Sequence, residues 1–193
     1  MVIVFRPKPK PPLETRMVVT VADLQPIHSR VTAAGNEVRA LTRLAVGDPI
    51  ATDEGGRARL RLDNGTAVVL DGSTTIELTK DGFKVLTGRV FVEAKTLPTL
   101  VELELGSITA VGSTLFVERR KKTTAYVGSG EVTARKAGKE TAVTTGDSVD
   151  FDEKLEVRPE RGFEDWTAGL AAPWSANGEI GRASCRERVS LNV

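Results

Sequence analysis

The sequence predicts an all-β fold, and three observations support this prediction. Apolar and polar residues alternate at period two, which is the spacing of a strand with one buried face. Asp-Gly and Asn-Gly pairs recur at short, nearly constant intervals and are typical of turns between strands. Helix signals are confined to one short stretch near the C-terminus. We therefore expect a compact single domain of short antiparallel strands, arranged as a β-sandwich or roll or as a short β-helix.

The composition agrees with a soluble domain that has a substantial core. The chain has 193 residues and is 40% hydrophobic, but only 5% aromatic, so Val, Leu, Ile and Ala must fill most of the interior. Lys and Arg number 27 and Asp and Glu number 26, for a net charge of +1. This balance gives no electrostatic reason to expect a nucleic-acid partner or an anionic membrane surface.

Residues 1–16 are expected to precede the folded domain. Met1–Phe5 is apolar, and a basic, proline-rich stretch follows it. A helix that spans a bilayer needs about 20 apolar residues, so we interpret residues 1–16 as the end of a truncated membrane helix followed by a stalk. The alternative is a frayed terminus with an extended proline linker.

The first strands of the domain are expected at 17–22, which is continuously apolar, and at 38–44, which alternates. In the second of these, Val38, Ala40 and Leu41 are assigned to the side of the core. Both assignments follow from the hydropathy pattern.

The clearest strand covers 57–62, where three apolar residues alternate with three arginines. Period two places the apolar residues on the buried face and the arginines in water. An arginine row of this kind is usually a solvated strand face, and the alternative is a surface that binds an acidic partner. Residues 63–65 then predict a hairpin turn, because Asn and Gly tolerate a positive φ. The three arginines are Arg57, Arg59 and Arg61.

The rest of the domain follows the same rhythm. Asp-Gly turns are expected at 71–72 and 81–82, and Gly88 is expected to end a strand. Residues 119–122 are expected to form a basic hairpin tip. Further strands are expected at 67–70, 75–78, 83–86, 90–92, 101–105, 108–111, 115–117, 125–127, 132–135 and 141–143.

Residues 159–178 are expected to be a linker that contains one short helix, at 161–174, which Pro173 ends. Two tryptophans lie in this linker. Trp166 is expected to pack on the β core, whereas Trp174 either packs there or contacts a following domain.

The C-terminal end is expected to be an artefactual tail. Glu179–Val189 is similar to the translation of a widely used sequencing adapter. Residues 179–193 are therefore set apart from the fold, as an expression scar would be.

No catalytic, cofactor-binding or metal-binding residue is predicted, and the chain is not expected to be an enzyme. The only cysteine, Cys185, lies in the tail, and His28 is the only histidine. A Cys/His zinc site and a histidine-activated nucleophile therefore lack their residues. The Asp-Gly turns also lack the spacing of a calcium loop. The candidate interaction residues are Arg57, Arg59, Arg61, Trp166 and Trp174.

Five segments, in order, resemble the FecR-type periplasmic domain, and together they cover about residues 17–152. Asn64 stands where the family often has another Asp. The segments are 44–52, similar to LxxGDxIxT; 56–70, similar to GxAxLxLxDGSxLxL; 86–90, similar to LxxGxV; 109–117, similar to TPxAxVGxxGTxFxV; and 127–147, similar to VxxGxVxV followed by LxxGE.

The resemblance implies that residues 17–158 are the non-enzymatic periplasmic signalling and protein-interaction domain of a regulator. Such a regulator is anchored in the cytoplasmic membrane and controls an anti-sigma segment, and its partner is an envelope receptor or signalling domain. The segment that pairs with a transporter's signalling domain is not recognisable in this chain. The alternative is an envelope scaffold or ligand-binding module, fused to other extracytoplasmic domains and without a sigma-factor role.

Overall fold

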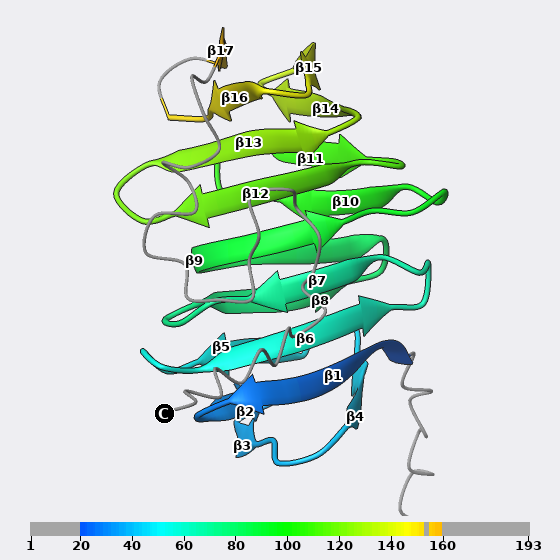
Figure 1. Ribbon diagram of the computed structural model, residues 1–193, viewed down its shortest axis with the longest axis vertical. Helices are drawn as coiled ribbons and strands as arrows, with labels where there is room; N and C mark the ends of the chain where they lie inside the picture. Colours follow the sequence, from blue (N-terminus) through cyan, green and yellow to red (C-terminus); the bar gives the residue numbers. More distant parts are fainter. Residues whose placement is uncertain (1–19, 153–154, 160–193) are drawn as a thin grey trace, which may run out of the picture.

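The computed structural model of the protein describes residues 20–152 and 155–159 (Figure 1). These residues form 17 β-strands and no helix, so the prediction of an all-β fold is confirmed. The helix expected at 161–174 lies outside the described residues, as do the stalk expected at 1–16 and the tail expected at 179–193.

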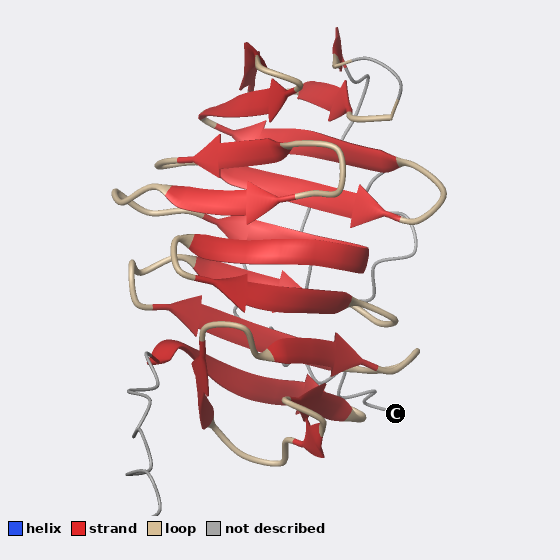
Figure 2. Cartoon of the chain, turned by 180° about the vertical axis from the view of Figure 1, so that it is seen from behind, coloured by secondary structure: helices blue, strands red, loops and turns tan. Residues whose placement is uncertain are grey.

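The strands form two sheets, A and B, that share one long strand. They run across the long axis of the molecule and stack along it (Figures 1 and 2). Sheet A has the spatial order β4 (Thr42–Ala45), β1 (Thr20–His28), β6 (Arg57–Leu62), β7 (Ala67–Leu70), β9 (Gly82–Glu93), β12 (Thr114–Arg119), β13 (Thr123–Ser129), β16 (Asp147–Asp150) and β17 (Glu156–Pro159). Sheet B has the order β3 (Asn36–Glu37), β2 (Val31–Ala33), β5 (Pro49–Thr52), β8 (Thr75–Thr79), β9, β10 (Thr99–Glu102), β11 (Ser107–Ala110), β14 (Glu131–Lys136) and β15 (Lys139–Thr144).

Strand β9 joins the two sheets at their centre. Its first half pairs with β8 and β10 in sheet B, and its second half pairs with β7 and β12 in sheet A. The change of sheet occurs at Gly88, whose φ is +94°. The expectation that Gly88 ends a strand is therefore wrong: the left-handed φ that glycine permits turns the strand from one sheet to the other without ending it.

One pair of strands departs from the expected antiparallel arrangement. β10 runs parallel to β9, with Leu100 opposite Gly82 and Val101 opposite Phe83. The chain leaves the end of β9 in sheet A and pairs next with the start of β9 in sheet B. This return makes the two strands parallel.

The core lies between the sheets and is mostly aliphatic. In β6, Ala58, Leu60 and Leu62 point into it, as their alternation predicts. The turn expected at 63–65 is also confirmed: Gly65 has φ +87° and its amide donates to the Leu62 carbonyl at 2.9 Å.

The strand expected at 38–44 is confirmed only at its end: residues 42–44 lie in β4, whereas 38–41 form no strand. β3 ends at Glu37 in sheet B and β4 begins at Thr42 in sheet A, so the residues between them cross from one sheet to the other. Val38 is buried, whereas Ala40 is exposed and Leu41 is 69% exposed. Hydropathy alone does not distinguish such a crossing from a strand.

Candidate interaction face

The outer face of sheet A, which is turned away from the core, carries a row of apolar side chains. Cross-strand pairing aligns Val69 with Phe91, Phe91 with Phe116, and Phe116 with Tyr126. Directly opposed residues in neighbouring strands lie about 5 Å apart, so these side chains form one continuous row. We call the four residues the apolar stripe. The rings of Phe91 and Phe116 are tilted by 54°, with centroids 4.6 Å apart, which is a favourable aromatic contact.

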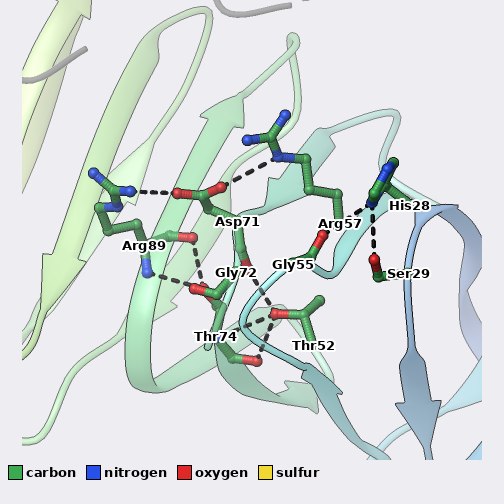
Figure 3. A network of polar contacts seen from close by, with 9 residues as sticks. All are labelled: His28, Ser29, Thr52, Gly55, Arg57, Asp71, Gly72, Thr74 and Arg89. Carbon is green, nitrogen blue, oxygen red and sulfur yellow. Dashed lines mark hydrogen bonds and ion pairs between the residues drawn. The ribbon is translucent and has the colours of Figure 1, made fainter. Parts of the chain in front are cut away.

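Beside this stripe lies a cluster of three charged residues, Arg57, Asp71 and Arg89, which we call the Asp71 triad (Figure 3). Arg57 Nε donates to Asp71 Oδ1 at 3.3 Å, and Arg89 Nη2 donates to Asp71 Oδ2 at 2.6 Å. The side chain of Asp71 is 7% exposed, and those of Arg57 and Arg89 are 16% and 21% exposed. At this depth water screens the attraction weakly, so the three charges depend on one another.

Two buried threonines fix the backbone on which the triad is built (Figure 3). The Thr52 hydroxyl donates to the Asp71 carbonyl at 2.6 Å and accepts from the Thr74 amide at 3.0 Å. The Thr74 hydroxyl donates to the Arg89 carbonyl at 3.1 Å and accepts from the Arg89 amide at 3.0 Å. These bonds tie the turn after β7 to β9, so the positions of Asp71 and Arg89 are set by the fold.

Arg57 corrects the expectation that all three arginines of β6 lie in water. It alternates with the core residues as predicted, but Asp71 draws its guanidinium into the triad. Arg59 and Arg61 are exposed as predicted, and neither forms an ion pair within the described part of the chain. Only these two arginines of the row therefore present a cation to solvent.

The edge of the face beyond Arg61 carries a separate charged cluster. Asp23 lies opposite Arg61 in β1 but pairs with Arg43, at 3.3 Å. Arg43 also donates to Asp63 at 2.5 Å, and this hydrogen bond raises the pKa of the Arg43 guanidinium. These carboxylates are engaged with Arg43, which leaves Arg61 as a cation on the surface.

A shallow polar hollow of about 500 Å³ lies beside the triad. The charged residues that line it are Glu54, Arg57, Asp71, Arg89 and Arg120. Arg120 belongs to the basic tip between β12 and β13, where its amide donates to the Lys122 carbonyl, so the hairpin tip expected at 119–122 is confirmed. Three arginines and two carboxylate residues line the hollow, so its lining carries a net excess of one positive charge.

The other predicted residues are placed as follows. His28 is exposed, and its Nδ1 lies 2.9 Å from the Ser29 hydroxyl and 3.2 Å from the Gly55 carbonyl. Among the residues that the structure describes, no group of three or more His, Cys, Asp or Glu is arranged to hold a metal. Trp166 and Trp174 lie outside the described residues, so their role stays a prediction.

Sequence reasoning missed Asp71, Arg89 and the apolar stripe. Asp71 was assigned only to a turn, although its carboxylate joins β6 to β9. The signal for the stripe was available in part: Phe91 alternates with Val90 and Val92, so all three cannot share one face. The strand pairing that lines up the three aromatic rings was not available.

The comparisons with known proteins give a family match for the centre of the chain and solved structures of similar fold. Residues 48–133 match the family model described as "FecR protein". No curated protein matches the chain. Two crystal structures of a protein from Parabacteroides distasonis ATCC 8503, described as a "putative anti-sigma factor", are similar in fold, each with a TM-score of 0.53 and 17% identity. Each match covers 63% of this chain and only 65% or 64% of the other, so about a third of those chains has no counterpart in it.

Proposed function

Because residues 48–133 make up a FecR-type domain, we propose that this chain is the non-enzymatic periplasmic signalling domain of a membrane-anchored FecR-like regulator. The match to the FecR family model carries the proposal. The matched residues run from the end of the turn before β5 to β14, and they include β9 and the Asp71 triad. The family's segment is thus the centre of the sandwich and of the candidate face.

The candidate face supports binding to a protein rather than catalysis. Its margin carries two exposed arginines, Arg59 and Arg61, and exposed charges of this kind are typical of the polar rim of a protein interface. Its buried carboxylate, Asp71, is engaged by two arginines. We propose that an envelope receptor or signalling domain with acidic groups meets the exposed guanidinium groups of Arg59 and Arg61.

The membrane anchor is part of the same proposal and rests on the apolar run Met1–Phe5 and the stalk after it. In the described part of the chain, no helix is long and apolar enough to span a bilayer. Alkaline phosphatase, fused after the domain in the complete gene, tests the location. The fusion is expected to be active, because this enzyme folds only after export; an inactive fusion with normal protein levels would contradict the periplasmic assignment.

Reversing the charge of Arg59 and Arg61 is expected to weaken signalling several-fold while the domain stays folded. Rim charges act chiefly on partner association, so Arg59→Glu combined with Arg61→Glu replaces attraction by repulsion. The measurement is the output of the sigma-dependent promoter in cells that carry the complete regulator gene, with circular dichroism of the purified domain as the check on folding.

The matched control places the same charge reversal at Arg135 and Lys139, two exposed cations of the β14–β15 hairpin in sheet B. The control variant is expected to signal normally. If both double variants signal like the unmodified protein, the face is not the partner site, and the role as an envelope scaffold or ligand-binding module is favoured instead.

A further inference from the structure

The apolar stripe is buried although it lies on the outside of the sandwich. Val69, Phe91, Phe116 and Tyr126 are 6%, 1%, 6% and 7% exposed. They belong to the strand positions that alternate with the core residues, so they point away from sheet B. The strands that the structure describes form two layers, and none of them lies against this face. The burial of the stripe therefore indicates a third layer.

The chain passes the end of the stripe when it leaves the sandwich. Tyr126 is opposite Ser148 in β16, and Ser148 is opposite Arg158 in β17. The row that contains the stripe thus ends at Arg158, one residue before the last residue of β17. The described chain therefore ends, at Pro159, next to the row that contains the stripe.

Residues 160–174 are long enough to extend along the stripe from β17. From β17 to β7 there are five strand spacings in sheet A, which amount to about 24 Å at about 4.8 Å each. Fifteen residues, 160–174, span about 22 Å as a helix and up to about 50 Å when extended. When extended, the segment reaches the whole stripe. As a helix it reaches Phe91 in β9, which is four strand spacings, or about 19 Å, from β17.

The composition of the segment is complementary to the face. Phe163, Trp166 and Leu170 recur at the i, i+3 and i+7 spacing of one helix face. Glu164 and Asp165 lie between them in sequence. The apolar residues match the stripe, and the acidic pair matches the cationic side of the Asp71 triad at Arg89, which lies beside the stripe.

We propose that residues 160–174 pack across the apolar stripe as a third layer, with Phe163 and Trp166 as the anchoring side chains. The occupant of this face is thus the chain's own segment, and a partner meets the exposed arginines at its margin. The inference does not depend on the signalling role, because it concerns the packing of the chain on itself.

Tryptophan fluorescence tests the proposal, because Trp166 and Trp174 are the only two tryptophans of the chain. In the full chain with Trp174→Phe, emission reports Trp166 alone, and in Trp166→Phe it reports Trp174 alone. Trp166 is expected to emit at shorter wavelength and to be quenched less by acrylamide than Trp174. Adding Phe116→Ala to the Trp174→Phe chain is expected to shift the Trp166 emission to longer wavelength.

Stability gives a second readout. Phe163→Ala combined with Trp166→Ala is expected to lower the midpoint of thermal unfolding by about 10 °C and to expose a face that binds an apolar dye. The control is the chain that ends at 178, without the tail that is similar to an adapter; its midpoint and dye binding are expected to match those of the full chain.

Three results would overturn the proposal. The first is a Trp166 that is as solvent-accessible as Trp174 in the full-length chain. The second is dye binding caused by removal of 179–193 alone. The third is a dimer in sedimentation that binds the apolar dye only after it dissociates, while the Phe163 and Trp166 substitutions leave dye binding unchanged. A second copy of the chain would then cover the stripe.

Discussion

Gly88→Ala is expected to destabilise the protein by about 3 kcal/mol or more, which is a large part of the stability of an ordinary domain. An alanine at φ +94° is strained by about 1–2 kcal/mol. A Cβ atom at this position would also lie 2.4 Å from Thr74 Oγ1, 2.5 Å from Thr74 Cα and 2.7 Å from the Ser73 carbonyl oxygen. Two of these atoms belong to backbone that cannot move aside cheaply, so overpacking adds to the strain. Urea unfolding measures the loss.

The matched control is Gly146→Ala. Gly146 has φ +89°, close to that of Gly88, but a Cβ atom there would meet nothing within 4 Å. This substitution therefore carries the backbone strain without the clash and is expected to cost about 1 kcal/mol. If the two variants lose equal stability, the close approach of β9 to Thr74 is not what requires glycine at position 88.

Asp71→Asn is expected to cost about 3 kcal/mol or more, because it leaves two largely buried guanidinium groups facing an uncharged amide. Asparagine has nearly the same volume as aspartate, so the loss in the free energy of unfolding measures the effect of removing the negative charge. Urea unfolding at neutral pH measures it. The triple replacement Arg57→Met, Asp71→Leu and Arg89→Met is expected to recover most of the stability, since it removes the buried charges together.

The control for the triad is Asp63→Asn on the same sheet. Asp63 also binds an arginine, Arg43, but the two side chains are 52% and 40% exposed. Solvent screens this pair, so its loss is expected to be much smaller. The double-mutant comparison of Asp71→Asn with Arg89→Met then measures the coupling inside the triad. An Asp71→Asn variant no less stable than Asp63→Asn would show that burial of the triad adds nothing.

The sequence was sufficient where a local rule decides the structure. The strand at 57–62 and the hairpin turn after it followed from alternation and from the tolerance of Gly65 for a positive φ. The alternation rule failed at Leu41. This residue lies in the connection that crosses from sheet B to sheet A, and its side chain is exposed to solvent. It also failed at Gly88, because a glycine that ends a strand and a glycine that redirects one look the same in sequence.

The candidate face was predictable only in part. Alternation placed Arg59 and Arg61 outside the core correctly, since this needs only the period of one strand. The Arg57 guanidinium is withdrawn from solvent because it binds Asp71, 14 positions later in the chain. The hydrogen bonds of Thr52 and Thr74 hold the turn that positions Asp71. Contacts of this kind arise from the register between strands, which depends on the whole sheet and not on any single segment.

The passage of β9 through both sheets has a mechanical consequence. A single backbone carries the central hydrogen bonds of both layers, so neither layer can peel away without breaking pairs in the other. Local unfolding of one sheet is therefore coupled to local unfolding of the other, and we expect the two sheets to unfold as one cooperative unit. A pull on either layer passes along an unbroken covalent path through Gly88 into the opposite one.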